Sequence, residues 1–289
     1  MAMTARTIER SPTELRTVAD PRGATLSSCY RLTFLIAALL VAAAGAGLLG
    51  VYRDNEWVAS QMRGQDFVSL LFALPLLLVS RYFARRGSVR ALLVWLGALG
   101  YLSYSYLYIF GVAWNGMFLI YLTLLFLSAS TLVRALTAID VTQIRQNFSK
   151  QAPTKAVARF LIGFGVVLGV MWGVQALVAT FTGEIPASVI SSGHPTAVVY
   201  ILDLGLVVPL FLIGGRALWR QEPWGFILAG LLLVKGVTEG LALLGMSLFM
   251  YLAHHPDFDI ALVPLWAAVA LASAYLSFRF YGAIRSDAT

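Results

Sequence analysis

The stretch GFILAGLLLVKGVTEGLALLGMSLFMYLA, residues 225–253, decides how this chain folds. It is almost entirely apolar, and about 20 apolar residues in a helix are enough to cross the ~30 Å hydrocarbon layer of a bilayer. The stretch therefore predicts a transmembrane helix. Two ionisable side chains, Lys235 and Glu239, interrupt it near the middle, one helical turn apart. They raise the question of function.

The rest of the chain resembles this stretch in composition. Of its 289 residues, 59% are hydrophobic and only 12% are charged, about half the charged fraction of a soluble domain. We predict an all-α fold, a polytopic transmembrane helix bundle with about eight spans. The predicted spans are residues 32–52, 67–84, 90–112, 116–138, 158–181, 197–219, 224–252 and 260–282.

The distribution of charge predicts the orientation of the bundle. If both termini are cytoplasmic, 18 of the 21 Lys and Arg residues lie on that side, because only Arg53 and Arg63 fall outside and Lys235 lies in the membrane. Such an excess is what the positive-inside rule requires. The predicted outer segments carry acidic residues instead: Asp54, Glu56, Asp66, Glu184, Asp257 and Asp259. The net charge of +7 is thus explained by topology, and we expect no nucleic-acid partner.

Two segments indicate an internal duplication of four helices. LPLLLVSRYFARRGSVRALLVWLG aligns without a gap on VPLFLIGGRALWRQEPWGFILAGL, which places Pro75 on Pro209 and Arg86 on Arg220. The segments SASTLVRALTAI and SAYLSFRFYGAI, near the ends of the two halves, also match. Four spans in each half would give both halves the same orientation, as in transporters with parallel repeats.

These patterns predict the following organisation. Residues 1–30 form a flexible cytoplasmic tail, and a first four-helix half covers residues 31–138. A cytoplasmic connection follows at 139–157, then a second four-helix half at 158–284 and a short cytoplasmic tail at 285–289. The polar start of the chain does not have the early apolar segment of a signal peptide.

The candidate site centres on three charged residues in the second half. A charged lysine at the depth of Lys235 costs about 2.5–3.5 kcal/mol to insert, and a pair with Glu239 on the same helix returns at most a few tenths of a kcal/mol. We therefore expect a further partner, and Asp203 in VVYILDLGLVVPL is the nearest candidate in depth. Asp203, Lys235 and Glu239 are predicted to converge between spans six and seven, as a ligand site or as a purely structural network.

Other polar side chains fall at a similar depth. Tyr101 and Tyr104 share one face of the third span, Gln175 lies in the outer half of the fifth, and Asn115 lies at the start of the fourth. We expect these four residues to line a cavity that opens to the outside. The alternatives are that Asn115 caps a helix and that aromatic residues near helix ends form an interfacial belt.

The sequence predicts neither a metal site nor a cofactor. His254, His255, Asp257 and Asp259 share one outer loop, with His194 in its neighbour, but their spacing matches no compact zinc motif. We interpret the loop as a solvated turn. An intramembrane lysine such as Lys235 also suggests a retinal Schiff base. In microbial rhodopsins that lysine lies in the last helix, with an acidic residue four positions earlier. Here Glu239 lies four positions later and another helix follows. Walker A, GxSxG, HExxH and dinucleotide-binding patterns are all absent from the sequence.

The segments YSYLYIFGVAWNGMFLIYLTLLFLS and LDLGLVVPLFLIGG, with the later WGFILAGLLLVKGVT, resemble a recurrent type of bacterial multi-pass membrane protein that has no assigned function. They contain Asn115, Asp203 and Lys235. The resemblance implies a bacterial inner (plasma) membrane location and carries no activity with it.

Three functions fit these observations. The first is a membrane protein that binds or transports a small solute or ion through an outward-facing polar site, which makes it similar to a transporter. The second is a membrane-embedded enzyme that acts on a lipid or isoprenoid, and a pocket that opens sideways to lipid would favour it. The third is a structural or assembly subunit of a membrane complex. The expected partners are the lipid bilayer and a small-molecule or ion ligand, with a homo-oligomer possible.

Overall fold

The computed structural model describes residues 21–285, and every extended element in this range is a helix. Residues 1–20 and 286–289, which make up most of the tails predicted at 1–30 and 285–289, lie outside the described residues. Helix α1, Pro21–Leu48, begins within the predicted N-terminal tail. Residues 21–30 are helical because this first part of α1 packs on the bundle: the Tyr30 ring lies 4.9 Å from the Trp95 ring.

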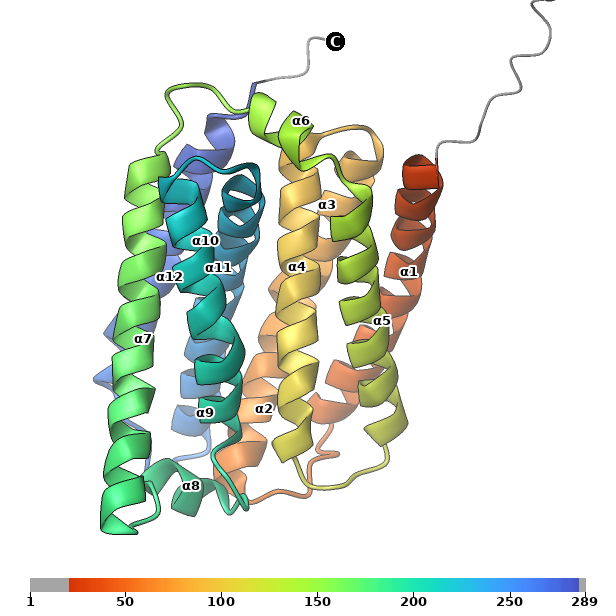
Figure 1. Ribbon diagram of the computed structural model, residues 1–289. Helices are drawn as coiled ribbons and strands as arrows, with labels where there is room; N and C mark the ends of the chain where they lie inside the picture. The colour runs from red at the N-terminus through yellow and green to blue at the C-terminus, as the bar shows by residue number, and fades with distance from the viewer. Residues whose placement is uncertain (1–20, 286–289) are drawn as a thin grey trace, which may run out of the picture.

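The all-α prediction is confirmed, and the chain is a multi-pass membrane protein. Seven helices of the described residues are long and apolar enough to cross a bilayer: Arg22–Leu48, Glu56–Arg85, Phe118–Ala138, Thr154–Thr182, Val198–Trp219, Pro223–Leu252 and Leu262–Gly282. The remaining predicted span, at 90–112, corresponds to α4, Val89–Leu107, which lies among the others (Figure 1). Its serines and tyrosines make it less apolar than the seven.

The helices follow the chain in a simple order. Between α1 and α4 come α2, Glu56–Val68, and α3, Leu74–Arg85, and after α4 come α5, Phe118–Ala138, and the short α6, Val141–Gln146. The second part holds α7, Thr154–Thr182, α8, Ala187–Ser192, α9, Val198–Leu202, α10, Val208–Trp219, α11, Pro223–Leu252, and α12, Leu262–Gly282. A 3-10 turn, Tyr108–Gly111, ends α4.

Two of the spans contain a π-helical turn in front of a proline. Ser69–Ala73 joins α2 to α3 ahead of Pro75, and Asp203–Val207 joins α9 to α10 ahead of Pro209. A proline in a helix has no N–H, and its ring collides with the carbonyl group four residues earlier. A wider π turn relieves that collision without ending the helix. The second of these turns begins at Asp203.

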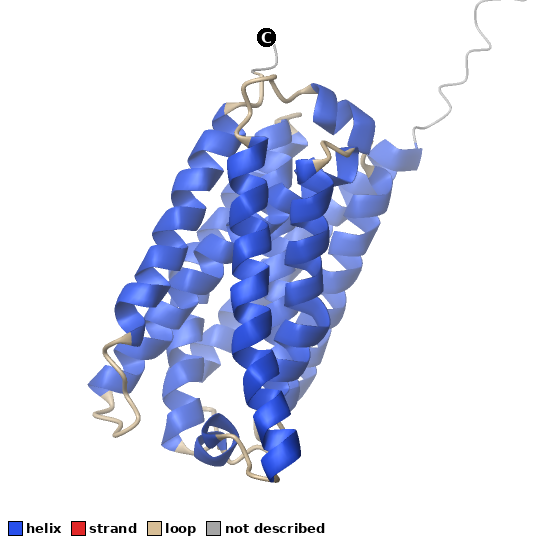
Figure 2. Cartoon of the chain, turned by 60° about the vertical axis from the view of Figure 1, so that its left-hand side comes forward, coloured by secondary structure: helices blue, strands red, loops and turns tan. Residues whose placement is uncertain are grey.

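The spanning helices form two groups of four that stand side by side in Figure 1. In the first group, α1, α3, α4 and α5 pack in a closed ring, with α1 along α5. In the second group, α7 packs on α10, α10 on α11 and α11 on α12, but α12 and α7 touch only over a short stretch. The second ring is therefore open between α7 and α12, which Figure 2 brings to the viewer's side of the bundle.

Helix α11 joins the two groups, because it packs along both α2 and α4. The close approach depends on Gly64 in α2 and Gly245 in α11: a Cβ atom on either one would overlap the backbone of the other. Ser69 of the π turn then meets Tyr101 of α4, with their hydroxyl groups 2.9 Å apart.

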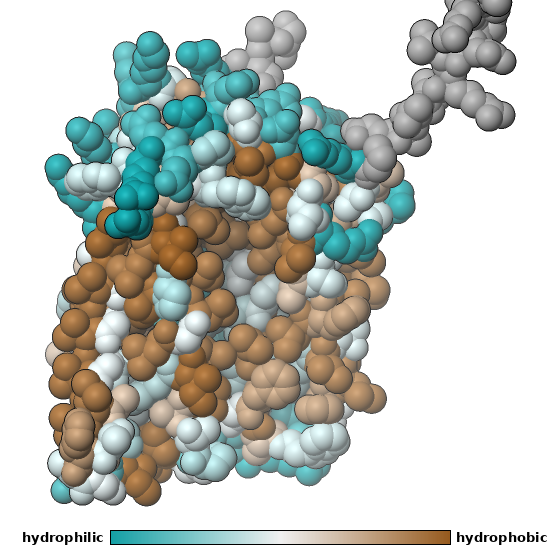
Figure 3. Space-filling model, viewed as in Figure 1, coloured by the Kyte–Doolittle hydropathy of each residue, from teal (hydrophilic) through white to brown (hydrophobic). Residues whose placement is uncertain are grey.

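The surface separates into a polar end and an apolar body. In Figure 3 the hydrophilic residues gather at the end that holds α6, and the sides below it are mainly hydrophobic. This end, here called the basic end, carries Arg85, Arg86, Arg145, Lys150 and Arg159. The opposite end, here called the acidic end, holds α8 and the loops around Asp54, Glu184 and Asp257.

Candidate functional site

A cavity of about 390 Å³ lies between the second group of helices and the helices α2 and α4 of the first group. Its walls come from α2, α4, α7, α11 and α12 and from the α9–α10 segment, and α8 and the loop that follows line it toward the acidic end. Most of the lining is apolar. The acidic and basic side chains that line it are those of Asp203, Lys235, Glu239 and His194.

Asp203 lies at the start of the π turn and is 8% exposed. Its two carboxylate oxygens accept hydrogen bonds from two other helices: the Tyr104 hydroxyl donates to Oδ1 at 2.6 Å and the Trp172 indole N–H donates to Oδ2 at 2.8 Å. Both donors are uncharged, and none of the ion pairs among the described residues includes Asp203. Its negative charge therefore has neutral hydrogen-bond partners only.

Lys235 and Glu239 form an ion pair along α11, with 2.9 Å between Nζ and Oε2. The lysine side chain is 9% exposed and the glutamate side chain 25%. Nζ also lies 3.5 Å from the centre of the Tyr104 ring, a cation–π contact that strengthens when the cation is removed from water. The aromatic ring and the carboxylate together replace the hydration of the ammonium group.

Tyr104 connects the three charged residues. Its hydroxyl group donates to Asp203 while its ring faces Lys235. All three charged groups therefore line one cavity. The prediction that Lys235 pairs directly with Asp203 is wrong. The π turn at Asp203 and the length of the Lys235 side chain leave room for the Tyr104 ring between them, and Lys235 pairs with Glu239 instead.

A second polar group lies closer to the acidic end of the cavity. The Tyr200 hydroxyl donates to the Gln175 side-chain oxygen at 2.8 Å and lies 3.2 Å from the Ser188 hydroxyl. The Tyr200 and Trp172 rings lie 4.5 Å apart. We expected Trp172 beside Gln175 in the lining of a cavity but did not anticipate Tyr200 as a member of the site. Tyr200 could have been found from its position, because it precedes Asp203 by three residues and so shares a helix face with it.

Two of the predicted site residues do not line this cavity. Tyr101 is fully buried and its hydroxyl group is used by Ser69 in the first group of helices. Asn115 accepts a hydrogen bond from the Met117 amide and donates to the Ala113 carbonyl, so it shapes the turn before α5. It lines a separate cavity of about 160 Å³ at the acidic end. The other five, Asp203, Lys235, Glu239, Tyr104 and Gln175, line the large cavity.

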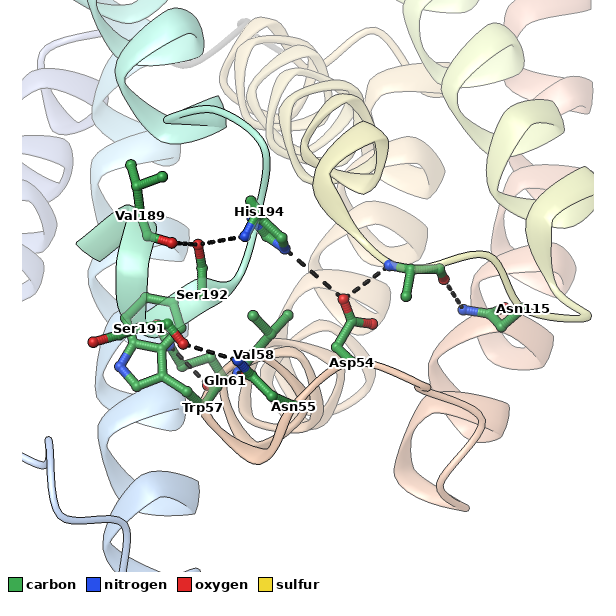
Figure 4. A network of polar contacts seen from close by, with 11 residues as sticks. Asp54, Asn55, Trp57, Val58, Gln61, Asn115, Val189, Ser191, Ser192 and His194 are labelled. Carbon is green, nitrogen blue, oxygen red and sulfur yellow. Dashed lines mark hydrogen bonds and ion pairs between the residues drawn. The ribbon is translucent and has the colours of Figure 1, made fainter. Parts of the chain in front are cut away.

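Hydrogen bonds between loops hold the acidic end of the cavity in place (Figure 4). Asp54 Oδ1 accepts from the Ala113 amide at 2.8 Å and lies 3.8 Å from His194 Nε2. The Asn55 side chain donates to the Ser191 carbonyl at 2.9 Å and also caps α2 by accepting from the Val58 amide. These contacts tie the loop before α2 to α8 and to the loop before α5.

The histidines do not gather around a common point. His194 faces Asp54, whereas the His255 ring accepts a hydrogen bond from the Asp257 amide in another loop. Within residues 21–285 no three His, Cys, Asp or Glu side chains are placed to hold a metal ion.

Asp66 lies elsewhere than the sequence suggested. We expected it in an outer loop, but it belongs to α2 and is 7% exposed, and its carboxylate accepts a hydrogen bond from the Tyr52 hydroxyl at 2.6 Å. The reason is that α2 begins at Glu56, capped by Asn55, eleven residues before the predicted span at 67. The first group of helices thus has a buried carboxylate of its own, outside the cavity.

Comparisons with protein-family models, with curated proteins and with solved structures gave no match, so the site is interpreted from its own residues.

Four of the residues that line the cavity are exposed. One is Thr196 in the loop after α8, and the other three are Gln175 on α7 and Leu262 and Leu265 on α12. These three border the open side of the second ring, where α7 and α12 barely touch. Exposed residues nearby on α7 and α12 are apolar, as at Val174 and Leu271. The opening, here called the mouth, therefore faces the side of the bundle that lipid would cover.

Proposed function

We propose that this protein binds a small molecule or ion in the cavity between α7, α11 and α12, and that it transports this ligand or presents it to a partner. The observation that carries the proposal is the buried Asp203 carboxylate, which lines the cavity and has only neutral donors, Tyr104 and Trp172, as partners. Ionisable groups inside a membrane protein are costly and are usually retained for function.

The polar residues would have distinct roles. Asp203 would bind a polar or cationic group of the ligand, and Trp172 would hold that carboxylate in place. Tyr104 contacts both Asp203 and Lys235, so a change in the charge of Asp203 would alter its contact with Lys235. Gln175 would offer its amide near the mouth. Tyr101 and Asn115, also candidates from the sequence, would support the fold around the site rather than contact the ligand.

The proposal includes a membrane topology. We propose eight spans, with α4 added to the seven, both termini in the cytoplasm, and the cavity in the outer half of a bacterial inner membrane. The basic residues at one end and the acidic residues at the other support this orientation. A reporter fused in the loop after α7 should then be exposed outside the cell.

We further propose that the two groups of four helices are a parallel repeat. The π turns begin at residues 69 and 203, and α4 and α11 begin at residues 89 and 223, so both pairs are 134 residues apart. This is the same separation as that of Pro75 from Pro209. Equal spacing of a proline, a π turn and a helix start supports a common origin.

The decisive experiment is native mass spectrometry of the protein released from a mild detergent, beside two variants. Asp203→Asn removes the cavity carboxylate. Asp66→Asn removes the other buried carboxylate, which lies outside the cavity, and is the matched control. We expect a discrete added mass on the wild type and on Asp66→Asn that is lost from Asp203→Asn. The same spectra show whether the chain is a homo-oligomer.

The opposite result is equally clear. If wild type and Asp203→Asn carry the same bound species, or both carry none while Asp203→Asn is merely less stable, the carboxylate has a structural role and the binding proposal fails.

The mouth favours a second candidate, a membrane-embedded enzyme that acts on a lipid or isoprenoid. Asp203 or Glu239 would then transfer a proton to or from the substrate. Incubation of the purified protein with extracted membrane lipids should produce a new lipid species that Glu239→Gln does not form. Unchanged lipids would exclude this candidate for the lipids supplied.

A further inference from the structure

The first observation is that the charges that line the cavity do not balance. Lys235 is already paired with Glu239, whereas Asp203 has hydrogen-bond donors but no cation. The fourth ionisable group of the lining, His194, faces Asp54 outside this cluster. Both oxygens of Asp203 act as acceptors, Oδ1 from Tyr104 and Oδ2 from Trp172. When Asp203 is ionised, one negative charge of this cluster has no cation, and a cationic ligand would neutralise it whereas an anionic ligand would add to it.

The second observation is that aromatic side chains line the same cavity. The lining includes Trp57, Tyr104, Tyr108, Trp172, Tyr200 and Trp266. The faces of such rings attract organic cations, and the attraction is largest when water is excluded. Lys235 demonstrates the effect within the site, because its ammonium group already lies on the Tyr104 ring. A ligand cation could use the remaining rings in the same way.

The third observation concerns the route into the cavity. The mouth opens between α7 and α12, and its border is mainly apolar, with Leu262 and Leu265 on one side. The deeper wall, at Phe164, Leu168 and Met171, is apolar too. A small hydrated cation would lose its water at such an entrance without compensation. A cation with a large apolar body would instead pass from lipid to the cavity with little loss.

From these three observations we propose that the cavity binds lipophilic organic cations that enter from the bilayer between α7 and α12. The positive charge of the ligand would lie beside Asp203 and its apolar body would lie toward the mouth. This inference rests on the proposed function, and it names the ligand class and the route for the same cavity.

The test uses two probes of the same shape and opposite charge, tetraphenylphosphonium and tetraphenylborate. The full-length protein is placed in lipid nanodiscs, binding of each labelled probe is measured by equilibrium dialysis, and the binding to empty nanodiscs is subtracted. We expect saturable binding of the phosphonium and none of the borate. Asp203→Asn should weaken phosphonium binding at least tenfold, and Asp66→Asn should leave it unchanged.

Two further variants keep the test informative if Asp203→Asn does not fold. Glu239→Gln also removes one negative charge from the cavity and should weaken phosphonium binding. Trp172→Phe keeps every charge but removes a donor to Asp203 and part of the aromatic wall, so it should weaken binding by a smaller factor. Borate binding as strong as phosphonium binding would overturn the inference, as would phosphonium binding that none of the three variants changes.

The failure of this inference can be distinguished from the failure of the proposed function. If mass spectrometry finds a bound species that depends on Asp203 but the phosphonium does not bind, the cavity is a ligand site for another chemical class. If neither the co-purified species nor the phosphonium depends on Asp203, both proposals fail together.

Discussion

The two groups of four helices place their elements alike but pack them differently. In the first group α1 and α5 are in contact along their length, and the ring is closed. Trp95 of α4 lies within it, donates to the Thr33 hydroxyl of α1 at 3.1 Å, and contacts the Tyr30 ring at a tilted angle. At the separation of 134 residues, Trp95 aligns with Ala229 of α11. The second group has no large residue at this position to reach α7.

Two glycines have a further effect on the second group. Gly236 and Gly240 of α11 allow α12 to approach so closely that a Cβ on either would press on Ser273 or Ala270. In the first group the aligned positions hold the larger Leu102 and Tyr106. Because α12 is drawn to α11 while α7 stays on α10, the second ring does not close, and the cavity and its mouth lie where the gap remains.

The polar residues differ at the same aligned positions. Ser69 and Tyr101 form a direct, neutral hydrogen bond of 2.9 Å in the first group. Their counterparts in the second group are Asp203 and Lys235, which the Tyr104 ring separates. The first group therefore combines a closed ring with a neutral hydrogen-bonded pair, whereas the second combines an open ring with ionisable groups. A neutral buried pair contributes about 1 kcal/mol, whereas a buried charge is costly unless its partners are complete.

The largest expected effect comes from separating the two groups. Gly64→Leu would force α2 away from α11, because a Cβ at Gly64 already overlaps the backbone at Gly245. Overpacking of a tight contact costs about 1–3 kcal/mol and more where backbone must move, so we expect loss of the monodisperse protein or a large decrease in Tm. Thermal unfolding in detergent measures the decrease in Tm.

Gly173→Leu on α7, where the added side chain meets open space, is the control and should leave Tm nearly unchanged. Equal Tm values for the two variants would contradict the close contact between α2 and α11.

The next effect tests the charged pair of the second group. Lys235→Met would leave Glu239 without its ion pair, and Glu239→Gln would leave Lys235 without its carboxylate. Removing one member of a buried pair costs about 3–5 kcal/mol, and we expect somewhat less here because Glu239 is partly exposed. The double variant should recover most of the stability.

Tyr101→Phe, which breaks the neutral pair of the first group, should cost about 1 kcal/mol. Free energies of unfolding for the four variants would show the difference, and a double variant no more stable than the single ones would mean that Lys235 and Glu239 are not coupled.

The sequence was sufficient for the overall architecture. Spans as apolar as residues 225–253 leave no other fold class, and most span positions agree with the helices. The largest error was the predicted start of the second span at residue 67, whereas α2 begins at Glu56. The segment around Gln61 and Asp66 is too polar for hydropathy to identify these first three turns. Only packing against α11 and the hydrogen bond from Tyr52 make that segment part of the bundle.

The site was predictable residue by residue but not in its connections. Asp203, Lys235 and Glu239 were identified by their depth in the membrane, which hydropathy shows. That Tyr104 would lie between them depends on the π turn and on how closely α4 packs on α11, and neither follows from one sequence. The mouth depends on the absence of contact between α7 and α12, which is a property of the whole arrangement.

The smallest effect tests the mouth itself and should leave stability unchanged. Cys29 is the only cysteine of the chain, so Leu265→Cys in a Cys29→Ala background carries a single reactive group at the mouth. We expect it to react with a lipid-soluble maleimide faster than with a charged, water-soluble one, and phosphonium should slow the reaction several-fold. Ile120→Cys on α5 is the matched control, because Ile120 aligns with Leu265 when Ser128 is placed on Ser273. α5 packs on α1 in the closed ring, so phosphonium should not protect this cysteine. Protection at both positions would indicate a general effect of the probe on the membrane, whereas protection at neither would mean that the ligand does not pass between α7 and α12.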